Sequence, residues 1–410
     1  MAERVVITGL GCVTPLGVLP EFWEGLTAGR SGIGALTAID AAPYETRIAG
    51  QVRDFDPHQF MGRREAASMS RCVQLGVAAG KMALEHAGLV PDGIERERVG
   101  IYLGTSIGPL GHAMEQHAVF LEKGIARVHP MAPAQNYPGV LASELAILLG
   151  LNGPAITIST ACTSGADAVG LALAQIRAGV VDVALAGGSE APIFPMLFAS
   201  FDRLGLMSRN NENPAAACRP FDLGRDGFAL SEGAAVCVLE SETYARSRGA
   251  SLLAELAGFG ASCDAYHHLQ QDPSGRQAAR AIESALRDAG AGVEDIGYIS
   301  AHGTGTRAND TFETAVIKQV FGKRAYDVPM SSIKSMCGHL MGACGALELV
   351  ACVKTLTDGV VPPTANLAMP DPDCDLDYVP NNARAASIGT ILSNTFGFGS
   401  RNAALVVRAF

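Results

Sequence analysis

The chain has 410 residues, of which 48% are hydrophobic and 18% charged, and its formal net charge is −10. This length and composition are typical of a globular protein larger than one small domain, and they exclude a largely disordered chain. The acidic balance disfavours nucleic acid as the main partner, because phosphate binding needs a basic surface.

The ten cysteines include no Cys-x-x-Cys pair. Neither a disulfide framework nor a zinc site is therefore expected, and reduced thiols in a core indicate a cytoplasmic protein. No apolar run reaches the 18 residues that a membrane-spanning helix needs. The segment Met1–Gly17 is broken by glycines and has no basic start, so it resembles a strand more than a signal peptide.

Short apolar runs predict buried strands, and longer periodic runs predict helices. In chain order the predicted elements are strand Arg4–Thr8, helices Pro20–Ala28 and Arg64–Ala87, strand Val99–Gly104, helix Pro138–Leu149, strand Ala155–Ser159, helix Gly165–Ala178, strands Val181–Ala186 and Ala234–Glu240, helix Ser241–Arg248, strand Ser251–Gly258, helix Gly275–Ala289, strand Ile296–Ala301, helix Asp310–Phe321, strand Pro329–Ser332, helix Gly342–Asp358 and strand Ala403–Ala409. The alternation favours an α/β architecture with mainly buried sheets.

Two segments share one pattern. Ile156–Gly179 and Ser331–Gly359 each read as a strand, a polar turn and a helix. The pattern suggests two related halves, residues 1–250 and 251–410, although this succession is also common by chance in α/β proteins.

Cys162 stands where a predicted strand ends and small residues lead into a helix near Gly165. A thiol at a helix N-terminus is expected to have a lowered pKa, and backbone N–H groups at such a turn can hold an oxyanion. The alternative is a buried structural cysteine, which is the common role of a free thiol.

His302 follows a predicted strand, in Ala301-His302-Gly303, and His339 stands just ahead of a long apolar helix, in Cys337-Gly338-His339. Neutral imidazoles there could donate N–H groups to a developing oxyanion. The alternatives are hydrogen-bonded structural histidines, or a zinc site with Cys337 and Cys344, whose spacing matches no familiar zinc pattern.

Four motifs in order resemble those of the β-ketoacyl-[acyl carrier protein] synthases, closest to the type II elongating enzymes. They are Thr160-Ala161-Cys162-Thr163-Ser164-Gly165, Ala301-His302-Gly303-Thr304-Gly305-Thr306, Lys334-Ser335-Met336-Cys337-Gly338-His339 and Asn394-Thr395-Phe396-Gly397-Phe398-Gly399. The resemblance runs from Val5 to the C-terminus and implies a thiolase-like fold of two similar halves, layered αβαβα and usually dimeric.

The resemblance also implies a mechanism. Cys162 would take an acyl chain from acyl carrier protein, and a malonyl-carrier would lose carbon dioxide and attack the acyl thioester. His302 and His339 would bind the malonyl thioester carbonyl. Such a division into transfer and condensation is covalent catalysis. No metal or cofactor is implied, because the acyl groups arrive on the phosphopantetheine of the carrier.

Further roles follow from the same resemblance. Lys334 and Glu348 would form a buried polar pair that organises the site. The Phe398 N–H would join that of Cys162 in an oxyanion hole, and the Phe398 ring would gate the acyl pocket. The remaining implied substrate-binding residues are Ile107, Thr304, Thr306 and His267.

Arg63 and Arg64 match a basic patch where the acidic carrier docks, although solvated charges at a helix end would look the same. The partners implied are acyl carrier protein and a second subunit, either a copy of this chain or a chain-length-factor-like protein.

The chain departs from the family pattern at Cys337, Cys344 and Ser400-Arg401, where the family commonly has Thr, a small residue such as Ala, and Gly-Thr. The last change raises a question about the movement of the gate, since losing a glycine narrows the φ/ψ choice. Whether the pathway makes fatty acids, polyketides or polyenes stays open.

Three rival functions share parts of this pattern. A thiolase needs a second cysteine in the C-terminal glycine-rich turn, which here is Phe396-Gly397-Phe398-Gly399. Initiating synthases use Asn where this chain has His339. A non-catalytic chain-length subunit lacks the nucleophile that Cys162 supplies.

Overall fold

The computed structural model describes residues 3–90 and 94–410, and its central feature is an 11-stranded mixed sheet. Ten of its strands follow the order β11-β10-β14-β15-β9-β1-β8-β7-β5-β6. Their bounds are β1 Val5–Thr14, β5 Val99–Gly104, β6 Ala155–Ile158, β7 Val183–Glu190, β8 Gly233–Ser241, β9 Ala254–Cys263, β10 Tyr298–Ser300, β11 Met330–Ser331, β14 Thr390–Gly397 and β15 Arg401–Arg408. The short strand β2 (Gly17–Val18) pairs with β1, and two small ribbons complete the strands: β3 (Ile33–Ala35) with β4 (Ile48–Gly50), and β12 (Val360–Val361) with β13 (Arg384–Ala385).

The two sides of this sheet have the same topology. Numbered within its own side, each set of five strands runs 3-2-4-5-1 from the outer edge to the middle. The directions also match, since strands 1, 5 and 4 pair antiparallel and strands 4, 2 and 3 pair parallel on both sides. The sides join through β1 and β9 by only two paired positions. The proposed division near residue 250 stays a prediction, which this repeat supports.

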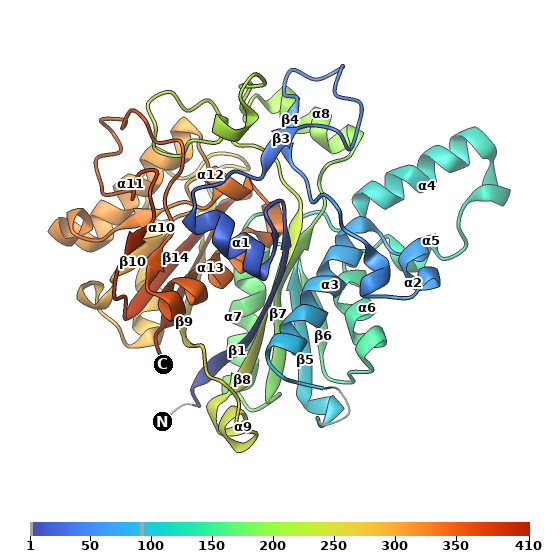
Figure 1. Ribbon diagram of the computed structural model, residues 1–410, viewed down its shortest axis with the longest axis horizontal. Coiled ribbons are helices and arrows are strands. Elements are labelled where there is room, and N and C mark those ends of the chain that lie inside the picture. The colour runs from blue at the N-terminus through green and yellow to red at the C-terminus, as the bar shows by residue number, and fades with distance from the viewer. Residues whose placement is uncertain (1–2, 91–93) are drawn as a thin grey trace.

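The helices form three layers around the strands (Figure 1). Helices α7 and α13 lie between the two sides of the sheet, α3 and α6 cover the outer face of the β5–β8 side, and α10 and α11 cover the opposite outer face. The helix bounds are α1 Leu19–Thr27, α2 Arg63–Ser68, α3 Arg71–His86, α4 Leu110–Lys123, α5 Ala132–Gln135, α6 Val140–Leu149, α7 Ser164–Arg177, α8 Pro195–Leu204, α9 Glu242–Ser247, α10 Arg276–Ala289, α11 Arg307–Phe321, α12 Lys334–Cys337 and α13 Cys344–Asp358.

Small residues bring the central helices close to the strands. A Cβ at Gly104, the last residue of β5, would lie 2.2 Å from the backbone carbon of Ser164 at the start of α7. A Cβ at Gly165 would lie 2.9 Å from the backbone oxygen of Gly342, just before α13. These approaches leave no room for a larger side chain, so the starts of both central helices meet at one place in the molecule.

The structure corrects several predicted elements. The single helix expected over Arg64–Ala87 is two helices, because Ser70 adopts an extended backbone between them and caps α3 by accepting the Val73 N–H. Strand β14 was not predicted, since Ser393, Asn394 and Thr395 interrupt its apolar residues. Helices α4 and α8 were also missed. Helix α4 buries none of its residues and projects from the body in Figure 1. No helix in the described part of the chain is long and apolar enough to cross a membrane.

Candidate active site

Cys162 lies in the sharp turn between β6 and α7, where the sequence predicted it. Its neighbour Ala161 adopts a φ of 56°, which non-glycine residues rarely adopt. The Ser164 hydroxyl stabilises this backbone, because it accepts the Thr160 N–H at 2.8 Å and donates to the Ala161 oxygen at 2.6 Å. The turn therefore presents the thiol at the first turn of a buried helix.

The expected low pKa of this thiol is wrong for the structure as it stands. Cys162 is 8% exposed, and burial raises its pKa to about 11. The charge of Lys334 and the backbone N–H of Phe398 act in the opposite direction but do not outweigh burial. Burial therefore favours the neutral thiol over the thiolate at this position.

His302 follows β10, and its backbone is held by a buried carboxylate. Glu313 of α11 accepts the N–H groups of His302 at 2.9 Å and of Gly303 at 2.8 Å. Burial raises the pKa of Glu313 to about 7. The His302 Nδ1 lies 3.2 Å from the Lys334 ammonium, which is the donor of that hydrogen bond when the ring is neutral.

His339 faces His302 across the same space, with 5.6 Å between the ring centroids and nearly perpendicular planes. Its Nδ1 accepts the backbone N–H of Met341 at 3.0 Å. Burial and the nearby Lys334 charge lower the pKa of His339 to about 3 and lower that of His302 well below its usual value. Both rings are therefore neutral near pH 7, with Nδ1 as acceptor and the proton on Nε2.

Lys334 and Glu348 form the buried ion pair that the resemblance implies. Both side chains are at most 2% exposed, and the ammonium contacts the carboxylate directly. Burial opposes the charge on Lys334, but the charge and hydrogen bond of Glu348, together with smaller contributions that include Glu313, outweigh burial and raise the pKa of Lys334. The Thr395 hydroxyl donates to the second Glu348 oxygen at 3.3 Å. The ammonium thus stays charged beside both imidazoles and keeps them neutral.

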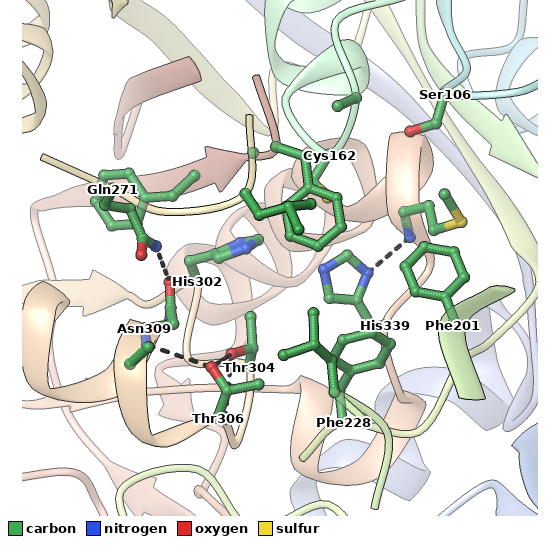
Figure 2. Close-up of a pocket in the computed structure, with 18 of the residues that line it drawn as sticks. Ser106, Cys162, Phe201, Phe228, Gln271, His302, Thr304, Thr306, Asn309 and His339 are labelled. Carbon is green, nitrogen blue, oxygen red and sulfur yellow. Dashed lines mark hydrogen bonds between the residues drawn. The ribbon is translucent and has the colours of Figure 1, made fainter. Parts of the chain in front are cut away.

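Cys162, His302 and His339 line one cavity of about 280 Å³ (Figure 2). Ile107, Thr304, Thr306 and Phe398 line it as well, and their roles in substrate binding stay predictions. The hydroxyls of Thr304 and Thr306 form a hydrogen bond of 2.9 Å on the side of the cavity away from Cys162. Most of the other wall is apolar and includes Phe201, Leu206, Phe228, Leu269 and Met341. The cavity can therefore hold a flexible apolar chain beside a polar arm.

His267 is not among the residues that line this cavity. Its Nδ1 accepts the backbone N–H groups of Leu269 at 3.1 Å and Gln270 at 3.2 Å, and its side chain is exposed. The ring thus holds the turn that carries Leu269, and the expected substrate contact of His267 stays a prediction. Arg63 and Arg64 are exposed at the start of α2, a position that permits docking and does not test it.

Ser400 ties this turn to the Phe398 loop. It has a φ of 64°, and its hydroxyl donates to the His267 oxygen at 2.8 Å and accepts the N–H groups of Tyr266 and His267 at 3.2 Å. The residue that replaces the family's usual glycine thus keeps the left-handed backbone and adds hydrogen bonds between the two segments.

Three polar residues in or near the cavity were not assigned to the site from the sequence. Gln271 donates to Asn309 at 3.2 Å, and both line the cavity. Glu190 ends β7 as a buried carboxylate. A charged residue at the end of the apolar run Val183–Gly188 was the signal available for Glu190, since strand ends carry sites in α/β sheets.

No group of three or more His, Cys, Asp or Glu residues that could hold a metal occurs within 3–90 and 94–410.

The model of the β-ketoacyl synthase N-terminal domain matches residues 2–245, and that of the β-ketoacyl synthase C-terminal domain matches residues 253–368. The chain belongs to the β-ketoacyl synthase family. The first of these matches alone covers more than half of the chain, and it includes Cys162; the second includes His302 and His339.

Two relatives show how wide this β-ketoacyl synthase likeness is. The chain is 42% identical over 409 residues to the 3-oxoacyl-[acyl-carrier-protein] synthase 2 of Synechocystis sp., covering 100% of this chain and 98% of that protein. It is 46% identical over 413 residues to the tetracenomycin polyketide synthase ketoacyl synthase alpha subunit of Streptomyces glaucescens, covering 99% of this chain and 97% of that protein. A 3-oxoacyl-[acyl-carrier-protein] synthase and a polyketide ketoacyl synthase subunit are thus about equally similar to it.

Solved structures of ketosynthases are similar to this chain over its whole length. The ishigamide ketosynthase/chain length factor has a TM-score of 0.94 at 38% identity, with 100% of both chains covered. The type II polyketide ketosynthase structure AntDE:AntF, which contains an acyl carrier protein, has a TM-score of 0.92 at 36% identity, also with full coverage of both chains. The thiolase-like α/β fold predicted from the sequence is confirmed.

Proposed function

We propose that the protein is a type II elongating ketosynthase that joins a Cys162-bound acyl chain to malonyl-carrier by decarboxylative condensation. The observation that carries this proposal is that a cysteine at a helix N-terminus and two neutral imidazoles with free Nε2–H groups line one cavity. A thiolase is disfavoured because no other cysteine lines the described cavity.

In the first step the Cys162 sulfur attacks the thioester carbonyl of an acyl-carrier. The thiol proton passes to the departing phosphopantetheine sulfur, so no net charge is left in the buried site. The tetrahedral oxyanion is held by the backbone N–H groups of Cys162 and Phe398. Gly397 permits this arrangement, since a Cβ there would lie 3.2 Å from the Cys162 nitrogen.

In the second step a malonyl thioester enters, and its carbonyl oxygen accepts the Nε2–H groups of His302 and His339. The bond from C2 to the carboxylate breaks and carbon dioxide leaves, and the electron pair forms an enolate that these donors stabilise. The enolate carbon then attacks the acyl thioester on Cys162. The carbon–carbon bond forms and the Cys162–carbonyl bond breaks, with return of the thiol proton from solvent.

Lys334 supports this step without touching substrate. Its ammonium donates to the His302 Nδ1, so the ring keeps its proton on Nε2, where the enolate oxygen needs it. Glu348 compensates the charge, which would otherwise be costly to bury. The thiol and the imidazoles supply the chemistry proposed, so the reaction calls for no group beyond the phosphopantetheine of the carrier.

The proposal includes a carrier and a second subunit. The exposed pair Arg63 and Arg64 would attract an acidic carrier protein. A cytoplasmic location is part of the proposal, since a reducing compartment keeps the Cys162 thiol free.

One experiment tests this function. Purified protein is given malonyl-carrier and a series of acyl-carriers, and product masses are read with and without a candidate chain-length-factor subunit. Products longer by two carbons with a 3-oxo group are expected. Activity of the chain alone indicates a homodimer, and activity only with the added subunit indicates a heterodimer. No product with any acyl-carrier in either arm contradicts the proposal.

A further inference from the structure

Glu190, the last residue of β7, is wholly buried, and none of the ion pairs in the described part of the chain includes it. A buried carboxylate is costly unless hydrogen bonds compensate it. The partners of Glu190 are five hydrogen-bond donors from two separate segments near the cavity. Their arrangement shows what the carboxylate does.

Four donors belong to the turn Thr105–Gly108 that follows β5. Oε1 accepts the Thr105 hydroxyl at 2.8 Å and the N–H groups of Ile107 at 3.3 Å and Gly108 at 3.2 Å, while Oε2 accepts the Ser106 N–H at 2.6 Å. Successive N–H groups that point inward make a small anion-binding hollow. The chain's own carboxylate fills this hollow and fixes Ser106 and Ile107, which line the cavity.

The fifth donor belongs to the loop of His339. Oε2 also accepts the Gly342 N–H at 3.1 Å, and the preceding residue, Met341, donates to the His339 Nδ1. The two segments touch, because a Cβ at Gly342 would lie 2.4 Å from the Ser106 nitrogen. One carboxylate oxygen therefore joins the turn after β5 to the loop that orients His339.

The same turn is bonded to the turn of the nucleophile. The Ser164 hydroxyl lies 3.2 Å from the Thr105 oxygen, and the Ser159 hydroxyl donates to the Ser106 oxygen at 3.0 Å. A continuous set of hydrogen bonds thus runs from the Cys162 turn through Thr105–Gly108 to Glu190 and on to the His339 loop.

We propose that Glu190 is a positioning residue that sets the spacing and orientation of His339 relative to Cys162 by joining the Thr105–Gly108 turn to Gly342. The inference rests on the proposed function and adds to it a residue that touches neither substrate nor the reacting atoms. Its role is distinct from that of Lys334, which controls the proton on His302.

The charge of Glu190 gives this role a signature that general damage to the fold does not have. After burial, which is the largest cause, the negative charge of Glu190 contributes to the raised pKa of Cys162. Replacing the carboxylate with an amide should therefore misplace His339 while making the thiol easier to ionise. Simple unfolding of the site would instead impair both groups.

The experiment uses Glu190→Gln in the full chain, assayed with its partner subunit if activity needs one. In this variant an amide NH₂ faces N–H donors and repels them. Decarboxylation of malonyl-carrier is expected to fall roughly 10- to 100-fold, by analogy with the loss of groups that orient histidine ligands at metal sites. Alkylation of Cys162 by iodoacetamide at pH 8 is expected to be equal or up to about tenfold faster.

Two further variants serve as a control and as a second test of the inference. Glu240→Gln removes another wholly buried carboxylate, whose partners are Thr8 and Arg248, and should leave decarboxylation unchanged. Thr105→Val removes one of the five donors, so it should reduce decarboxylation in the same direction by a smaller factor, and it carries the test if Glu190→Gln does not fold.

Decarboxylation by Glu190→Gln within twofold of the parent overturns the inference. A parallel fall in decarboxylation and alkylation also overturns it, because that pattern indicates general loss of structure. An active parent with an unaffected variant contradicts this inference alone, whereas a parent that never decarboxylates malonyl-carrier contradicts the proposed function and the inference with it.

Discussion

The two sides of the sheet place different chemistry at matching positions. The third strand of each side, β6 or β11, leads into a central helix, α7 or α13. On the first side a short turn presents Cys162 at the start of the helix. On the second side the connection is longer and holds α12, with Lys334, before His339. The same succession of strand and central helix thus holds the proposed nucleophile after a tight turn, and the proposed oxyanion donor after a longer connection that includes Lys334.

The second strand of each side, β5 or β10, shows the same likeness between the sides. The turn after β5 and the turn after β10 are each held by a buried carboxylate that accepts backbone N–H groups, Glu190 in the first and Glu313 in the second. The first turn supplies a wall of the acyl pocket through Ile107, and the second supplies His302. The scaffold around the turns is alike, and the function lies in the side chains that the turns display.

The strongest test of this comparison replaces the proposed catalytic residue of each side in a separate variant. Cys162→Ala should abolish condensation, while Cys162→Gln should still decarboxylate malonyl-carrier, because the histidines remain. His339→Ala should reduce decarboxylation roughly 10²- to 10³-fold, the usual effect of losing one oxyanion donor. Release of carbon dioxide and product mass measure the two steps. Normal elongation by Cys162→Ala would refute the nucleophile assignment.

Lys334→Met tests the ion pair that only the second side has. Leaving the buried Glu348 carboxylate without its partner should lower the free energy of unfolding by about 3–5 kcal/mol. Chemical denaturation measures this loss. Lys354→Met, which breaks the exposed pair with Asp358, is the control and should change stability by less than about 1 kcal/mol. Equal effects of the two variants would argue against a special cost of the buried pair.

Truncating the Phe398 ring tests the gate. The ring packs against Phe201 at 6.3 Å between centroids, on the wall beside Cys162. Phe398→Ala should slow acyl transfer to Cys162 on the order of tenfold, because the acyl chain is less well positioned, and should affect decarboxylation less. Single-turnover acylation and carbon dioxide release separate the two. The gate idea fails if both rates fall by the same factor.

The pH dependence of decarboxylation, which tests the histidines of the second side, should differ from that of Cys162 alkylation on the first side. Burial and the Lys334 charge lower the pKa of His339 to about 3 and lower that of His302 well below its usual value, so both rings should stay neutral when the pH falls below the usual histidine pKa. Decarboxylation by Cys162→Gln should therefore be nearly flat from pH 5 to 8, as expected for groups that titrate below this range. Alkylation of the parent thiol should keep rising toward the Cys162 pKa of about 11. A decarboxylation rate that rises steeply near pH 6.5 would contradict neutral imidazoles.

The smallest effect is expected at Ser400. Ser400→Ala keeps the left-handed backbone and loses the hydroxyl's hydrogen bonds, so it should destabilise the fold by about 1–2 kcal/mol. Ser400→Gly loses the same bonds but relieves the backbone, and it should be more stable than Ser400→Ala by about 1 kcal/mol. Thermal and chemical denaturation compare them. An alanine variant as stable as the parent would show that the hydroxyl adds nothing.

Apart from Glu348, which only the family resemblance implied, the sequence by itself determined the fold class and the family and predicted the site residues Cys162, His302, His339 and Lys334. These lie in local signals, either at ends of apolar strands or in short motifs, and local patterns survive in a linear chain. It failed where long-range packing decides, as in β14, whose polar residues are buried only because other strands pair on both sides.

Tertiary structure alone decided the electrostatics and the joining of the turns. Burial raises the pKa of Cys162 although the helix start predicts the opposite, because desolvation depends on everything packed around the thiol. Glu190 meets Gly342, 152 residues away in the chain, and the His267 ring accepts the backbone N–H of Leu269. Such contacts follow from how strands and helices stack, which no local pattern contains.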